Sequence, residues 1–208
     1  MLSTLASARS WPLFIGLIVA YLVVSPLLTL HASSSLAPLS ADDAHYILPT
    51  RTVLRSPSDA AAAITSSVHG TATPSAVVRQ AVLTALLASP LMAGAGAVAT
   101  SSLLRTPPTG LAAGPMHALP LIPIAAGLLD MAQNLLFAAA ASAVAGGGDA
   151  LHHVPYTGAI AAINFAAYAA AWASLLTVVV SAAVFSTAIG RDGRQGQLLK
   201  PIGRSKAE

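Results

Sequence analysis

Three polar side chains interrupt an otherwise apolar stretch of the sequence, LPLIPIAAGLLDMAQNLLFAAAAS. They are Asp130, Gln133 and Asn134, and a helix would place Asp130 and Asn134 one turn apart on the same face. A carboxylate at the centre of a membrane helix costs about 2.5 to 3.5 kcal/mol on insertion scales, so it needs a partner in protein or water. This intramembrane polar cluster is the strongest chemical signal in the chain.

Two interpretations of Asp130 are open. In the first, Asp130 is a proton or cation site. In the second, it is a protonated hydrogen-bond donor that ties two helices together, which we call the clamp. The sequence favours the clamp, because no second acid or histidine lies at matching depth to complete a proton relay.

Two more polar groups lie in other apolar stretches. Arg79 and Gln80 stand about one turn inside the second stretch, where Arg79 could snorkel to the headgroups. A pair between Arg79 and Asp130 is the alternative, although their depths differ by about 9 Å at 1.5 Å per residue. We expect snorkelling.

The fourth stretch carries Asn164, Tyr168 and Trp172 at successive fourth positions, which is one face of a helix. This stripe could line a ligand groove. We favour packing of Asn164 against the third helix through Asn134.

Two loops contain carboxylates and imidazoles that could form a metal site, but such spacings are common by chance in loops. The residues are Asp42, Asp43, His45, Asp149, His152 and His153. The chain has no cysteine and no Walker, HExxH, GxSxG or kinase signature. We therefore expect no metal, no cofactor and no enzymatic activity.

The composition places these residues in a membrane protein. Of 208 residues 55% are apolar and 8% charged, with a mean hydropathy of +0.74, whereas soluble domains carry about 25% charged residues. Four apolar stretches are long enough to span a bilayer, which takes about 20 residues each. Their predicted limits are 11–31, 76–100, 118–145 and 157–189.

The predicted fold is all-α, a single four-helix transmembrane domain over residues 1–208 with a longer outer loop at 32–75 and a basic tail at 190–208. Within the loop, Ser56-Pro57 and a run of alanines predict a short helix at 57–68, and residues 46–48 are expected to be extended. Gly190 is expected to end the fourth helix, which is long enough to tilt or to project into water. Pro26, Pro90 and Pro123 predict kinks, and Gly94, Gly96 and Gly127 predict close helix packing.

The distribution of basic residues predicts the orientation. With four spans both termini share one side, which would hold Arg9, Arg105 and five basic tail residues, against Arg51 and Arg55 on the other. Both termini are therefore expected in the cytoplasm, in a plasma or endomembrane rather than a mitochondrial one. The apolar segment 12–30 is longer than the usual core of a signal peptide, so we interpret it as a retained first helix.

A local motif gives one resemblance. Asp130 and Asn134 match an Asp-x-x-Glu-Asn element in the third helix of a loosely defined group of small, uncharacterised four-helix membrane proteins, and Gln133 stands where that element has Glu. The resemblance implies the four-helix architecture and no activity. Because Gln133 is neutral, it argues against a paired-carboxylate metal site.

These observations lead to two hypotheses for function. The first is a non-enzymatic accessory or scaffold subunit that contacts the lipid bilayer and other membrane proteins or further copies of itself. The second is a small oligomeric transporter or channel that uses Asp130 as a proton or cation site. Nucleic-acid binding is not expected, because basic charge beside a membrane span is typically topogenic.

Overall fold

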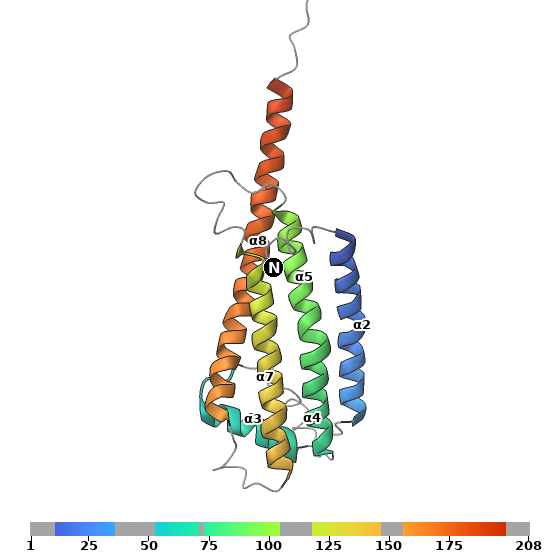
Figure 1. Cartoon of the computed structure of the whole chain (residues 1–208), viewed down its shortest axis with the longest axis vertical. Coiled ribbons are helices and arrows are strands. Elements are labelled where there is room, and N and C mark those ends of the chain that lie inside the picture. The colour runs from blue at the N-terminus through green and yellow to red at the C-terminus, as the bar shows by residue number, and fades with distance from the viewer. Residues whose placement is uncertain (1–10, 36–52, 71–72, 105–117, 147–155, 199–208) are drawn as a thin grey trace, which may run out of the picture.

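The structure is a computed structural model that describes residues 11–35, 53–70, 73–104, 118–146 and 156–198. Most of the described part is helical and none of it is strand, which confirms the predicted all-α class. The described residues form four helical rods of membrane-spanning length. They stand side by side, and a short helix lies across one end of them (Figure 1). We refer to that end as the α3 end.

Each rod is long and apolar enough to cross a membrane. The first is α2, Trp11–Ser35, and the third is α7, Leu121–Ala145. The second is continuous from Pro74 to Leu103 and is made of α4 (Pro74–Leu83), the π-helical segment η3 (Thr84–Ala88) and α5 (Ser89–Leu103). The fourth is α8, Thr157–Leu198. The number of spans agrees with the sequence, and the first three match its limits to within a few residues.

The prediction that Gly190 ends the fourth helix is wrong, because α8 continues to Leu198. A glycine inside a helix costs only about 1 kcal/mol relative to alanine, and no proline occurs between Thr157 and Lys200 to stop the helix. The 42 residues of α8 span about 63 Å at 1.5 Å per residue. Its last turns project past the other helices, as the excess length predicted (Figure 1).

The second rod widens where it meets Pro90. The backbone N–H of Ser89 donates to the carbonyl of Thr84, five residues back, which is the hydrogen bond of a π-helix. Proline cannot donate and crowds the preceding turn, so a wider turn accommodates it. Pro123, by contrast, lies in the first turn of α7, where it removes no helical hydrogen bond.

The short helix α3, Pro57–His69, confirms the helix predicted at 57–68. The Ser56 hydroxyl accepts a hydrogen bond from the Asp59 amide at 3.1 Å, and Gly70 follows the last turn. The inward face of α3 carries Ala60, Ile64 and Val68, which recur every fourth residue.

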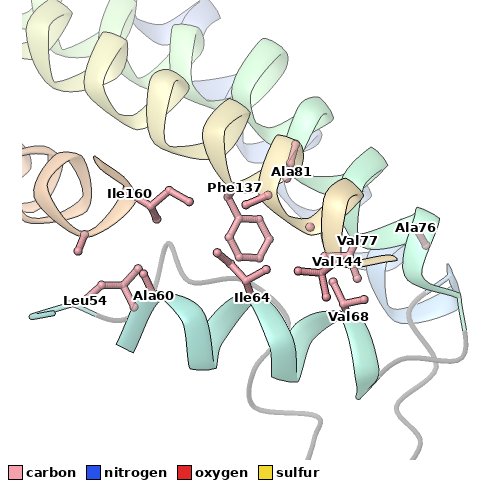
Figure 2. Close-up of a cluster of buried hydrophobic side chains, with 14 residues drawn as sticks. Leu54, Ala60, Ile64, Val68, Ala76, Val77, Ala81, Phe137, Val144 and Ile160 are labelled. Atoms are coloured by element: carbon pink, nitrogen blue, oxygen red, sulfur yellow. The ribbon is translucent and has the colours of Figure 1, made fainter. Parts of the chain in front are cut away.

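This face closes the α3 end of the bundle with the main hydrophobic core. In Figure 2 the ring of Phe137 from α7 lies above Ile64, between Ile160 of α8 and Val144. Phe137 is 1% exposed and Ile64 is fully buried. Val77 of α4 belongs to the same cluster (Figure 2). The core therefore joins α3 to the second, third and fourth rods.

Candidate functional site

The intramembrane cluster is positioned by a close crossing of α5 and α7. A Cβ atom added to Gly127 would lie 2.3 Å from the Cβ of Ala93 and 3.1 Å from the carbonyl oxygen of Ser89. A Cβ added to Gly96 would lie 2.8 Å from the Cβ of Pro123. Both glycines are therefore required by contact, as predicted, and they hold the two backbones close at the level of Asp130.

Asp130 bonds across this crossing. The hydroxyl of Ser89 lies 2.5 Å from Asp130 Oδ2 and 3.2 Å from the Thr84 carbonyl oxygen. The Thr84 carbonyl also accepts the Ser89 N–H, so both polar groups of Ser89 lie within hydrogen-bonding distance of it. Asp130 thus joins α7 to α5 through Ser89, which is the kind of link between two helices that the clamp interpretation describes.

Asn134 supports Asp130 through the backbone. Its Nδ2 donates to the carbonyl oxygen of Asp130 at 2.8 Å, within the same helix, and its side chain is buried. The amide therefore leaves the carboxylate free for other groups. Asp130 Oδ1 receives no hydrogen bond from the residues that the structure describes.

The half-buried side chain of Asp130 lines a cavity of about 760 Å³ between the rods, and this cavity is partly open to the outside. All four rods contribute residues to the wall of the cavity. Helices α5 and α7 pack against each other, α2 packs on α5, and α8 packs on α7. Asp130 is the one charged side chain among the described residues that line it. The other polar lining residues are Tyr21, Ser25, Gln80, Thr84, Ser89, Gln133, Asn164, Tyr168 and Ser174.

Two buried amides in this wall have unused hydrogen-bonding atoms. Gln80 and Gln133 are each 2% exposed. Nε2 of Gln80 donates to the Leu28 carbonyl at 3.1 Å, while its Oε1 has no partner among the described residues. Nε2 of Gln133 has none there either. Buried polar atoms are nearly always satisfied, so these two amides hold hydrogen-bonding capacity that the described residues do not use.

Arg79 does not join the site. Its side chain is exposed on α4, while the next residue, Gln80, points inward to the cavity. Asp130 bonds Ser89 instead, so the alternative pair between Arg79 and Asp130 is not formed. Exposure on the rod's surface agrees with the snorkelling interpretation.

The stripe on α8 divides between the core and the surface. Asn164 is buried, Tyr168 is 39% exposed and Trp172 58% exposed. Four residues of an α-helix turn by about 400°, so each step moves the stripe about 40° around the helix. Asn164 Oδ1 accepts a hydrogen bond from the Leu54 amide at 2.7 Å, which ties the segment before α3 to α8.

The candidate metal ligands of the loops, Asp42, Asp43, His45, Asp149, His152 and His153, lie outside the described residues, as does the extended piece at 46–48. Within the part of the chain that is described, no group of three or more acidic or histidine side chains could hold a metal ion.

Sequence reasoning missed Ser89 and the wall that α2 contributes. Ser89 precedes Pro90 and lies one helical turn before Ala93. Small residues one turn apart are typical of a helix crossing, and this spacing could have identified Ser89 as a residue that faces another helix. Phe14, Ile18 and Tyr21 of α2 gave none, because their types are ordinary for a membrane helix.

The fold and the cavity define a class: the chain is an integral multi-pass membrane protein whose described part has four spans and, between them, a mainly apolar cavity with a small set of polar side chains in its wall. Comparisons with protein-family models, curated protein sequences and solved structures found no match.

Proposed function

We propose that the protein is a membrane carrier for a cationic solute that binds in the central cavity at Asp130. The observation that carries this proposal is the pairing of a cavity of about 760 Å³ with a single charged side chain in its described wall. The volume falls within the range of about 300 to 1,000 Å³ typical of small-molecule sites.

The charge of the solute follows from electrostatics. A carboxylate away from bulk water is stabilised by donors and positive charge, and Ser89 supplies only one neutral donor. The free Oδ1 of Asp130 can accept a second bond from a cation. An anion would meet the carboxylate without any described positive side chain in the wall to offset the repulsion.

The accessory-subunit hypothesis is the second candidate, and one feature of α2 favours it. Only 6% of the residues in its apolar window are buried, compared with 33% in the second rod and 28% in α7. Its exposed side chains include Ile15, Val19 and Leu22, at 53% exposure or more. This face would contact lipid, a second copy or another subunit.

Uptake by proteoliposomes distinguishes the two functions. The purified protein would be reconstituted and supplied with K⁺, methylammonium or the organic cation ethidium, with Asp130→Asn as the test variant. Asp59→Asn is the matched control, because it makes the same chemical change on α3, outside the cavity.

A carrier moves at least one of these cations, and Asp130→Asn reduces that flux at least about tenfold while Asp59→Asn leaves it intact. No flux in the parent protein, or equal flux in Asp130→Asn, would contradict the carrier. Co-purification of another membrane protein at a fixed ratio would then favour the accessory subunit.

A further inference from the structure

We propose that the ligand of the cavity is a lipophilic ammonium ion that carries N–H donors and a nearby oxygen acceptor, as in a long-chain amino alcohol. The inference rests on the proposed cation site at Asp130 and names the chemical class that fits the rest of the wall. Four features support it: the apolar lining, two unsatisfied amides and a hollow beside the cavity.

The side chains that line the cavity favour a ligand with a hydrocarbon portion. Apart from the polar residues given above, the wall consists of aromatic, aliphatic and small side chains, among them Phe14, Ile18, Met92 and Val178. A bare metal ion or proton would fill little of this space and would leave the apolar part of the wall without a partner. A hydrocarbon portion fills it instead.

The donors of the ligand are specified by two acceptors. Asp130 Oδ1 receives no bond from the described residues. The amide of Gln80 has a fixed orientation, because its Nε2 must face the Leu28 carbonyl, and this leaves Oε1 as an unpartnered acceptor. An ammonium group with N–H bonds can donate to acceptors of this kind, whereas a quaternary ammonium cannot donate.

The hydroxyl of the ligand is matched to a second amide, that of Gln133. Gln133 lies one turn from Asp130 on α7, is buried and lines the same cavity, and its Nε2 lacks a partner among the described residues. No hydrogen bond from the described residues fixes which way this amide faces, and a hydroxyl near the ammonium group can both donate and accept, so it satisfies the buried end of the amide in either orientation. An alkylamine without oxygen would leave that end of the amide unsatisfied.

The hydrocarbon chain has a path along α8. A second hollow of about 310 Å³ is lined by Tyr168, Ala171, Trp172 and Leu175, and all of these except Trp172 also line the main cavity. Tyr168, Trp172 and Leu175 are 39%, 58% and 53% exposed, so this side opens away from the bundle. At this depth of a spanning helix the surroundings are lipid, which suits a ligand with a long apolar tail.

Equilibrium binding to the full-length protein in lipid nanodiscs tests the inference. Tritiated sphinganine, a long-chain amino alcohol, would be the probe. The competitors would be octadecylamine, which lacks hydroxyl groups, octadecyltrimethylammonium, which lacks N–H bonds, and octadecanol, which lacks the charge.

Sphinganine should bind saturably, octadecylamine should compete about tenfold more weakly, and the other two should compete least. Asp130→Asn should weaken binding at least about tenfold, with Asp59→Asn unchanged. Octadecanol competing as well as octadecylamine, or Asp130→Asn binding as tightly as the parent, would overturn the assignment.

Gln133→Leu separates the oxygen contact from folding. Because Nε2 of Gln133 is unpartnered in the ligand-free bundle, the change should not lower the unfolding temperature. It should remove the preference for sphinganine over octadecylamine and leave the affinity for octadecylamine as it was. A retained preference would refute the role given to Gln133.

The outcomes also separate this inference from the carrier proposal. Flux of K⁺ or methylammonium that depends on Asp130, without binding of any long-chain amine, would refute the ligand class and leave the carrier standing. Binding of sphinganine through Asp130 without any cation flux would refute the carrier and leave the ligand site standing.

Discussion

The α3 end and the middle of the bundle are built from the same rods but filled in opposite ways. At the α3 end, Phe137 is 1% exposed and meets Ile64, which is fully buried (Figure 2). Two turns along the same helix, Asp130 borders a cavity of about 760 Å³. One helix, α7, therefore serves both as core and as wall.

The difference comes from the size of the facing side chains. At the cavity level α5 and α7 present Ala93, Gly96, Ala126 and Gly127, which allow the backbones to touch but cannot fill the space beside them. At the α3 end a branched or aromatic side chain comes from each neighbouring element. Where the helices approach through small residues, the volume left over becomes a site.

The largest expected effect is on the free energy of unfolding, when a phenylalanine of the α3 end and one of the cavity wall are each replaced by alanine. Phe137→Ala removes the centre of the packed region and should cost about 3 to 5 kcal/mol of unfolding free energy. Phe14→Ala, in the half-buried cavity wall, mainly loses the edge-to-face contact with Trp11 at 5.7 Å, so we expect less than about 1.5 kcal/mol. Unfolding in mixed micelles would measure both, and equal losses would contradict the contrast between the regions.

A smaller effect is expected from the helix crossing. Gly127→Ala would place a Cβ 2.3 Å from that of Ala93, which should destabilise the bundle by about 2 kcal/mol because backbones must move. Gly16→Ala is the matched control in α2, where nothing lies within 4 Å of the added atom. It should be neutral or stabilising. Thermal unfolding of the two variants would test this, and a neutral Gly127→Ala would show that the crossing is looser than described.

The smallest expected effect comes from single cysteine substitutions that test on which side of the membrane the α3 end lies. Helix α2 begins and α8 ends opposite the α3 end (Figure 1), and the basic residues predict that this opposite side is cytoplasmic. Ser58→Cys, exposed on α3, should react with an impermeant thiol reagent in intact cells. Ser205→Cys, in the basic tail, should react only after permeabilisation. The reverse pattern would invert the orientation.

Much of the fold was predictable because its determinants are local. Apolar length identified the four rods, and Ser56-Pro57 identified the start of α3. The end of α8 was not predictable from Gly190, because one glycine weakens a helix without ending it. The depth of Asp130 in its span was also predictable, because it follows from the position of Asp130 within the apolar stretch.

The site's composition depended on tertiary contacts that a single sequence does not encode visibly. Asp130 was recognisable as a charge in an apolar run, but its partner Ser89 lies 41 positions earlier. Asn164 bonds the backbone of Leu54, 110 positions away, which no spacing rule connects. Gly96 and Gly127 were recognisable in the sequence as small residues, but whether they border an unfilled space depends on the side chains of the neighbouring helices.

Protection of Asp130 from a membrane-permeant carbodiimide tests the central claim, that the cavity binds a cation at this carboxyl group. The protein in liposomes would be treated with dicyclohexylcarbodiimide, with and without ethidium, and modification of the Asp130 peptide quantified by mass spectrometry. We expect modification in the absence of ethidium, saturable protection of at least about fivefold by ethidium, and none by the uncharged aromatic compound phenanthrene. Modification of Asp130 that ethidium leaves unchanged would contradict the account.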